Sequence, residues 1–388
     1  MLESTNRLEE LGSCLAEASE LYPEDPKLNL MLARSDRRKG DIDSALSRLE
    51  RLKGNCTDQA LLSRVCFEMA YMYDSAGRIE DAYNNFRDGN DVDRVTYQKL
   101  GISSDPSRKI IAAMNSLDLQ AIRYLSDCNS PPVDNTSIAF IIGFPRSGTT
   151  LLHQIFAAHP LVDVLDEKPL LAPIKNKIDS MSAGYPQALL SLDEELLLNL
   201  KNEYMESMAT HIYRSQSEIV IDKLPLNLID LPLISLLFPQ AKIILALRHP
   251  LDCCLSCFMQ MFNPNQSMSN FLSLEDATSY YSDVMGLLEG YQKYLPLQYM
   301  TIRYEEIVHN LESETRRACS FLGVDWNPSM LEYYKNARKQ ALINTPSRHQ
   351  VTQPLYTDSI EKWRRYEQYL APYKPGLSEL SKNFGYRL

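Results

Sequence analysis

The sequence predicts an α/β protein in which helices flank a parallel sheet and an all-α region precedes the sheet. Two observations lead to this prediction. From about Thr136 onward, short apolar runs of strand length alternate with stretches of helical periodicity, which is typical of a parallel sheet with crossover helices. Before that point, the first ~100 residues contain a helical pattern that repeats with an offset of 37 residues.

The repeat in the first part of the chain is defined by small residues and a glycine at fixed spacing. Four residues recur 37 positions later, as Ala33/Ala70, Gly40/Gly77, Ile42/Ile79 and Ala45/Ala82. Small residues let two helices pack closely, and each glycine is expected to end the first helix of a pair. Because this layout resembles tetratricopeptide repeats, residues 1–100 are predicted to form a repeat-like helical domain. Such a domain either positions a partner or only stabilises the fold that follows it.

A short helical connection is expected between the repeats and the sheet. Helical patterns cover residues 107–116 and 117–125, and Ser130-Pro131-Pro132 then marks a boundary. We therefore expect a helical linker at residues 101–134 and one α/β domain at residues 135–388. A chain of 388 residues is long enough for two domains with cores of their own.

The composition excludes several classes of protein. A net charge of −10 argues against a nucleic-acid partner and against a basic membrane-surface protein. Apolar runs stay shorter than a membrane span, and the acidic start of the chain does not resemble a signal peptide. Eight scattered cysteines indicate reduced thiols rather than a disulfide framework. We expect a cytoplasmic protein, and the sequence leaves a homodimer open.

The first strand of the predicted sheet leads into a loop with the chemistry of a phosphate site. An apolar run at 138–142 ends at Gly143, and a helix begins at Thr149 after Gly148. A strand, a glycine-bounded loop and a helix together aim backbone N–H groups at a phosphate. The ordinary phosphate loop places a lysine where this chain has Thr149, and the cation has moved into the loop as Arg146. This substitution suits a phosphate-linked anion that needs no metal.

Three further strands of the predicted sheet end in polar or aromatic residues. The strand at 242–247 ends at Arg248, and Ser256 follows in the next helix. The strands at 218–221 and 299–302 end near Lys223 and Tyr304. Because ligands of open parallel sheets lie beyond the carboxyl ends of the strands, we expect these side chains to share one site.

Two of these segments carry a resemblance to a known family. FPRSGTTLL and LRHPLDCCLSCF resemble the nucleotide-binding signatures of sulfotransferases that use 3′-phosphoadenosine 5′-phosphosulfate (PAPS). The chain is most similar to the tyrosylprotein branch and to bacterial sulfotransferases fused to tetratricopeptide repeats. The resemblance implies a P-loop-like sulfotransferase fold and PAPS as donor, released as 3′-phosphoadenosine 5′-phosphate, with no metal. It implies nucleotide contacts by Pro145, Arg146, Ser147, Gly148, Thr149, Thr150, Arg248, Ser256, Tyr304 and Lys362.

The same resemblance assigns catalytic roles. Glu167, which follows Arg146 by 21 residues, would be the general base, and Arg146, Lys223 and Ser347 would stabilise the moving sulfuryl group. The chemistry requires such groups, because the acceptor hydroxyl loses a proton while negative charge builds on the leaving oxygen. His153 and His159 are competing candidates for the base.

The identity of the acceptor stays open at this point. The resemblance implies a hydroxyl on a protein, a glycan or a small molecule, and the helical repeats offer a way to position a protein or peptide. Two other functions are considered. A phosphate-loop kinase would need the missing lysine and a strand aspartate, for which Asp222 is a poor candidate. The other function is that of a repeat scaffold whose nucleotide domain no longer catalyses a reaction.

Overall fold

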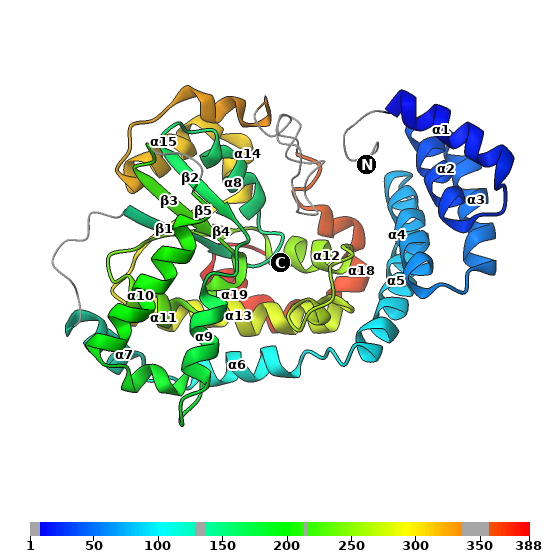
Figure 1. Cartoon of the computed structure of the whole chain (residues 1–388). Coiled ribbons are helices and arrows are strands. Elements are labelled where there is room, and N and C mark those ends of the chain that lie inside the picture. The colour runs from blue at the N-terminus through cyan, green and yellow to red at the C-terminus, as the bar shows by residue number, and fades with distance from the viewer. Residues whose placement is uncertain (1–7, 129–136, 213–215, 336–356) are drawn as a thin grey trace. The chain divides into compact units, whose positions relative to one another are not determined.

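The computed structural model describes residues 8–128, 137–212, 216–335 and 357–388. These residues divide into two compact units, each described by itself below (Figure 1). The helical unit contains Met1–Asp105, Cys254–Thr278 and Lys362–Tyr373, and the α/β unit contains Pro106–Cys253, Ser279–Glu361 and Lys374–Leu388. The divisions at residues 100 and 134 that the sequence suggests remain a prediction.

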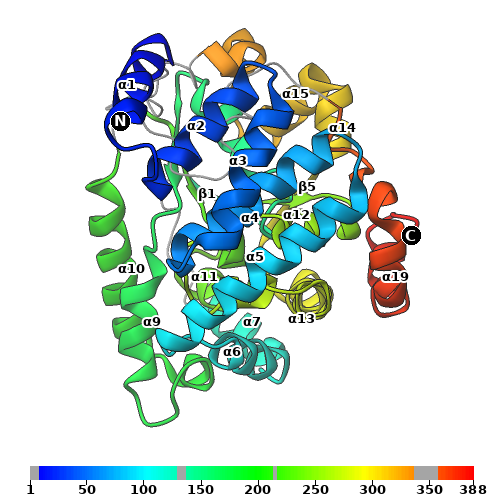
Figure 2. The same ribbon diagram turned by 90° about the vertical axis from the view of Figure 1, so that its right-hand side faces the viewer.

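The helical unit begins with five helices. They are α1 (Leu8–Leu21), α2 (Pro26–Arg38), α3 (Ile42–Asn55), α4 (Gln59–Ser75) and α5 (Ile79–Lys99). As predicted, a glycine with positive φ follows the first helix of each pair, at Gly40 (φ 85°) and Gly77 (φ 75°). Figure 2 shows α2 with α3 and α4 with α5 as neighbouring helices. The repeated layout is therefore present, and its assignment to the tetratricopeptide type remains a prediction.

The small residues of the repeat lie where helices meet. Ala33, Ala45, Ala70 and Ala82 all have no exposed surface. A larger side chain at any of these positions would separate two helices, because packed interiors hold no spare volume. The offset of 37 residues is therefore the period of a packing contact.

Two later parts of the chain complete the helical unit. Asn90 donates a hydrogen bond to the carbonyl of Phe258 (2.9 Å). Asp74, at the end of α4, accepts hydrogen bonds from Lys362 (2.6 Å) and from the hydroxyl of Tyr366 (2.8 Å). The later elements of this unit include η3 (Met268–Phe271), η5 (Lys362–Tyr366), α18 (Glu367–Leu370) and η6 (Ala371–Tyr373). Neither segment was expected to join the repeats.

The α/β unit is built on a sheet whose five strands, within the described residues, are all parallel. Their bounds are β1 (Ser137–Gly143), β2 (Val162–Asp166), β3 (Ile219–Lys223), β4 (Lys242–Leu247) and β5 (Gln298–Arg303). The strand order is β2-β3-β1-β4-β5. Four strands match the predicted runs, whereas β2 was missed. This structure confirms the predicted fold class.

Helices cover both faces of the sheet (Figure 1). Ala139 and Ile141 of β1 pack with residues of α8 (Thr149–Ala157), α14 (Tyr304–His309) and α15 (Leu311–Leu322). Phe140 points to the opposite face, where its ring lies 6.3 Å from Tyr204 and 6.0 Å from Phe238. A strand buried on both faces needs apolar residues at every position, which explains the continuous apolar run of β1.

The remaining elements of this unit surround the sheet. They are α6 (Asp105–Asn115), α7 (Leu119–Cys128), α9 (Leu171–Asp179), η1 (Gln187–Ser191), α10 (Glu194–Ala209), η2 (Pro225–Leu228), α11 (Leu231–Leu237), α12 (Pro250–Phe258), α13 (Leu274–Tyr294), η4 (Pro328–Glu332) and α19 (Lys374–Asn383). Helices α12 and α13 each lie partly in the helical unit. In the described part of the chain, every helix is too short or too polar to cross a membrane.

Candidate functional site

The carboxyl edge of the sheet gathers the predicted site residues of the α/β unit. In the parallel register, Asp166 lies opposite Lys223, and Gly143 lies opposite Ala246. Arg248 directly follows β4, and Tyr304 directly follows β5. The expectation that these strand ends share one edge is confirmed, although four of them were recognised from the sequence and the fifth, β2, was not.

Both glycines that bound the loop after β1 are required by close packing. A Cβ atom on Gly143 would lie 2.5 Å from the carbonyl oxygen of Ala246 on the neighbouring strand. A Cβ atom on Gly148, whose φ is 100°, would lie 2.9 Å from the ring of Tyr304. No side chain fits at such distances without a shift of backbone or ring. The glycine spacing seen in the sequence is therefore a structural requirement of this loop.

The loop itself has features of an anion cradle. Arg146 adopts a left-handed backbone (φ 69°), which is costly for a residue other than glycine and recurs at ligand sites. The hydroxyl of Ser147 is buried and has no hydrogen-bond partner among the described residues. Helix α8 then begins at Thr149 with no side-chain cap on its first N–H groups. The Ser147 hydroxyl and the start of α8 thus provide one unpartnered donor and a helix N-terminus, which fit a phosphate group.

Arg248 adds a buried positive charge beside this loop. Its side chain lies largely out of solvent (7% exposed), and its Nη1 donates to the carbonyl of Arg146 (3.0 Å). The guanidinium lies over the ring of Tyr304, 4.8 Å from the ring centroid. Its Nη2 donates to the carbonyl of Ser359 (2.5 Å), and its Nε has no acceptor among the described residues. Burial acts to lower the pKa of Arg248, but the charges of Asp252 and Glu305 raise it, although neither carboxylate forms a direct ion pair with the guanidinium in the described ranges. Because a buried charge is costly unless it is paired, this arginine fits an anionic ligand.

A second charged cluster lies at the ends of β2 and β3. The side chain of Lys223 has no exposed surface, and its Nζ lies 2.8 Å from Oε1 of Glu167. The same Nζ also contacts Oδ1 of Asp166. His153, on α8, places its Nδ1 3.1 Å from that Oδ1. Burial favours the neutral acid, but the contact with His153 and the charge of Lys223 hold the pKa of Asp166 well below its usual range.

Glu167 reaches this cluster through an unusual backbone conformation. Successive residues of a strand point to opposite faces of the sheet, so Asp166 and Glu167 would normally not meet one ammonium. Glu167 has a left-handed backbone (φ 51°), and its N–H donates to the carbonyl of Lys223 (2.9 Å). This turn brings both carboxylates to Lys223. Glu167 and Arg146, two predicted catalytic residues, are two of the three non-glycine residues with positive φ in the described chain.

The three other predicted residues are not tested by the geometry of this edge. Ser256 and Lys362 belong to the helical unit, where Nζ of Lys362 binds Asp74. Ser347 lies outside the described residues. Their roles remain predictions.

The two histidines considered as bases occupy different surroundings. His153 contacts Asp166, as described above. His159 binds main-chain groups on both sides, because its Nε2 lies 2.8 Å from the carbonyl of Asp325 and its Nδ1 accepts from the N–H of Leu161. His159 therefore holds the turn after α8 in place.

Asp222 points away from the loop. It is fully buried on β3, one residue before Lys223, and its Oδ2 accepts from the hydroxyl of Tyr204 (2.7 Å) and from Asn227 (3.2 Å). Burial raises the pKa of Asp222 to about 7, although both hydrogen bonds and the charge of Lys223 act to lower it. An aspartate turned to the opposite face cannot hold a metal ion beside the loop, which disfavours the kinase alternative.

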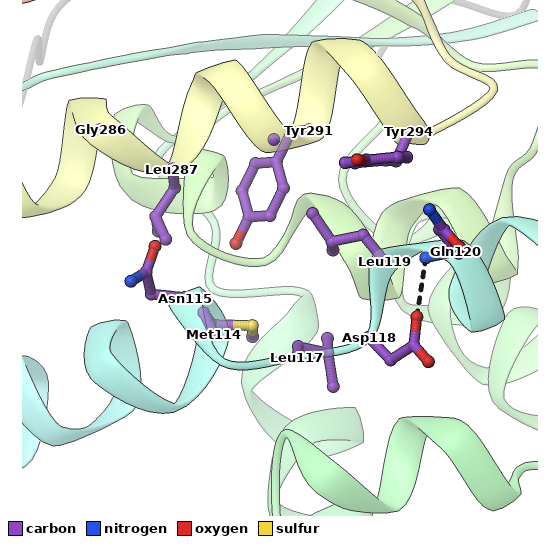
Figure 3. Close-up of a pocket in the computed structure, with 11 residues that line it drawn as sticks. Met114, Asn115, Leu117, Asp118, Leu119, Gln120, Gly286, Leu287, Tyr291 and Tyr294 are labelled. Atoms are coloured by element: carbon purple, nitrogen blue, oxygen red, sulfur yellow. Dashed lines mark hydrogen bonds between the residues drawn. The ribbon is translucent and has the colours of Figure 1, made fainter.

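A separate pocket of about 350 Å³ lies between α13 and the turn from α6 to α7 (Figure 3). Leu287 and Tyr291 point from α13 toward this turn, and Asp118 accepts a hydrogen bond from the N–H of Gln120. None of the residues that line the pocket is a predicted site residue. We therefore place the candidate site at the carboxyl edge of the sheet.

Sequence reasoning missed Asp166 and the contact that His153 makes with it. Both depend on β2, whose sequence Val-Asp-Val-Leu-Asp is short and carries two aspartates. The alternation of valine and aspartate at 162–164 is the signal that could have identified it.

Comparison with known proteins agrees with this chemistry. Residues 139–328 match the sulfotransferase family. An uncharacterized protein of Aquifex aeolicus is 34% identical over 241 residues, which cover 60% of this chain and 31% of that protein. Protein-tyrosine sulfotransferase 1 of Danio rerio is 25% identical over 241 residues, 58% of this chain and 65% of that protein. The chain thus spans less than two thirds of either relative.

One solved structure extends the comparison. The sulfotransferase domain of the olefin synthase from Synechococcus PCC 7002 has 23% sequence identity and a TM-score of 0.47. The match covers 66% of this chain and 98% of that domain.

The buried carboxyl of Asp222 predicts a pH-dependent stability. The pKa of Asp222 is about 7 in the folded state and 3.8 in the unfolded chain. Its contribution to the free energy of unfolding is therefore fully present below pH 3.8 and is lost as the pH rises through about 7. Asp222→Asn cannot ionise, so it should gain about 2–3 kcal/mol relative to wild type between pH 5 and pH 8 in urea unfolding. Tyr204→Phe, which removes a donor to the carboxylate, should shift the loss to higher pH. Parallel stability curves for Asp222→Asn and wild type would contradict this account.

Proposed function

We propose, from the premise that this chain belongs to the sulfotransferase family, that it transfers a sulfuryl group from PAPS to an acceptor hydroxyl. The observation that carries the proposal is the buried guanidinium of Arg248 beside a loop with an unpartnered Ser147 hydroxyl. These groups offer two places for anions at one sheet edge. A nucleotide with a 5′-phosphosulfate and a 3′-phosphate carries two such anions.

The loop from Pro145 to Thr150 would hold the 5′-phosphosulfate. Arg146 has a left-handed backbone, α8 begins without a side-chain cap, and Ser147 adds a hydroxyl with no partner among the described residues. Arg248 and Tyr304 would hold the 3′-phosphate and the nucleoside. Ser256 and Lys362 are proposed as further nucleotide contacts on the strength of the resemblance alone.

The loop chemistry favours transfer without a metal ion. A kinase loop uses a lysine and a hydroxyl that binds Mg²⁺, with a strand aspartate as a second ligand. Thr149 replaces the lysine here, and Asp222 faces the other side of the sheet. A sulfuryl group carries less charge than a γ-phosphoryl group, so fewer cations are needed to stabilise its transfer.

Four residues are proposed to carry the chemistry of transfer. When bound, the donor supplies an activated sulfuryl group attached through oxygen to its 5′-phosphate. Glu167 would accept the proton of the acceptor hydroxyl, because it is the more exposed carboxylate of the cluster. Lys223 and Arg146 would stabilise charge on the sulfuryl group and on the leaving oxygen. Ser347 is proposed for the same role from the resemblance.

The acceptor is proposed only as a class. A hydroxyl on a protein, a glycan or a small molecule fits the cluster around Glu167. The curated relative from Danio rerio is named as acting on protein tyrosine, and delivery of a protein or peptide acceptor by the helical repeats is a proposal of the same kind.

Arg248 tests the proposed anion site directly. Arg248→Ala should weaken the binding of 3′-phosphoadenosine 5′-phosphate by about 2–4 kcal/mol, because a buried charge-assisted contact is lost. Isothermal titration calorimetry measures this change. Arg303→Ala is the matched control, because Arg303 ends the neighbouring strand and binds Glu306 instead. Equal effects of the two substitutions would contradict the assignment.

Glu167 tests the proposed reaction. Glu167→Gln should lower PAPS turnover by ~10²–10⁴-fold, the range of a general base, and should leave nucleotide affinity within about threefold. Turnover is followed by chromatography of the nucleotide product in the presence of pooled phenolic, sugar and peptide hydroxyls. Wild-type turnover that Glu167→Gln leaves intact would remove Glu167 from the mechanism.

A further inference from the structure

The two carboxylates that contact Lys223 are not equivalent. Asp166 ends a regular strand, and its side chain is 26% exposed. Glu167 stands on a left-handed backbone, and its side chain is 43% exposed. Lys223 itself has no exposed surface. One ammonium is thus held between an inner and an outer carboxylate.

The inner carboxylate has a second partner and the outer one does not. Oδ1 of Asp166 contacts both Nζ of Lys223 and Nδ1 of His153, which lies on α8. His153 is buried, with 6% of its surface exposed, so its ring position is set by packing. Within the described residues, the carboxylate of Glu167 binds Lys223 and no other side chain. Asp166 is therefore fixed from two sides.

A buried ammonium has to keep a carboxylate partner throughout the reaction. If Glu167 accepts a proton it becomes neutral, and its attraction for Lys223 is lost. An unpaired ammonium with no exposed surface would then pay a large desolvation cost. The low pKa of Asp166 means that this second carboxylate stays ionised at the pH of the reaction. A single carboxylate could not serve as base and as permanent partner together.

We propose that Asp166, oriented by His153, is the permanent anchor of Lys223, and that Glu167 is its exchangeable partner. This inference rests on the proposed function. The acceptor oxygen forms a bond to sulfur with its own electron pair, while its proton passes to Glu167. The bond between sulfur and the phosphate oxygen breaks, and its electron pair stays on that oxygen. Lys223, still held by Asp166, keeps its protons and its charge throughout the transfer. Asp166 and His153 are positioning residues that touch no substrate.

Hydrogen exchange of the Lys223 ammonium with water tests the anchor without any substrate. The signal is read from ¹H–¹⁵N spectra of lysine ammonium groups in deuterated protein and is assigned by its loss in Lys223→Arg. Asp166→Asn should raise the exchange rate by at least about tenfold, the factor expected for one lost charged hydrogen bond. Glu167→Gln should change the rate by less than about threefold, because the anchor remains. The control Asp163→Asn removes another carboxylate of the same strand and should also leave the rate unchanged.

Turnover gives the second readout. Asp166→Asn should lower kcat for PAPS turnover by about 10–100-fold and leave KM for PAPS within about threefold, because the nucleotide is bound elsewhere at the sheet edge. If Asp166→Asn does not fold, His153→Phe removes the orienting contact and keeps both carboxylates. Like Asp166→Asn, His153→Phe should raise the exchange rate of the ammonium and lower kcat.

The outcomes separate the two proposals. Exchange that is unchanged in Asp166→Asn, or raised more by Glu167→Gln, overturns the anchor. If the variants change the exchange rate as expected while the wild-type protein does not turn over PAPS, the anchor is supported and the proposed function is rejected.

Discussion

The buried ammonium of Lys223 is the constraint on which the acidic half of the site depends. A positive charge without solvent needs anionic partners, and two consecutive residues supply them, Asp166 and Glu167. Consecutive strand residues cannot both face one atom, so the backbone turns left-handed at Glu167. The left-handed backbone at that residue is therefore a consequence of placing two consecutive carboxylates on one lysine.

The basic half of the site follows from a similar constraint with the opposite sign. Arg248 is buried and forms no direct ion pair among the described residues, and it holds the loop through the carbonyl of Arg146. The glycines on either side of that loop allow β4 and Tyr304 to approach it closely. A parallel sheet brings the two halves to the same edge, because all its strands end there. One edge thus presents unfilled donors next to a carboxylate able to accept a proton.

The sequence was sufficient for features that depend on local pattern. Four apolar runs became strands, the spacing of Gly143 and Gly148 became the loop, and Arg248 lies beside it. Contacts between distant segments were not predictable in this way. Strand β2 was missed because two aspartates interrupt five residues, and Asp166 was missed with it. The segments at 254–278 and 362–373 join the helical unit through contacts such as Asp74 with Lys362, which no periodicity encodes.

The central claim is that this sheet edge binds a nucleotide with two anionic groups and no metal ion. Calorimetric titration of the wild-type chain with 3′-phosphoadenosine 5′-phosphate in the presence of a chelator, and separately with ATP and Mg²⁺, tests it most directly. The account predicts tight binding of the first ligand, unaffected by the chelator, and weaker binding of the second. Preference for ATP with Mg²⁺ would contradict the sulfotransferase assignment and favour a kinase, and binding of neither ligand would leave a scaffold.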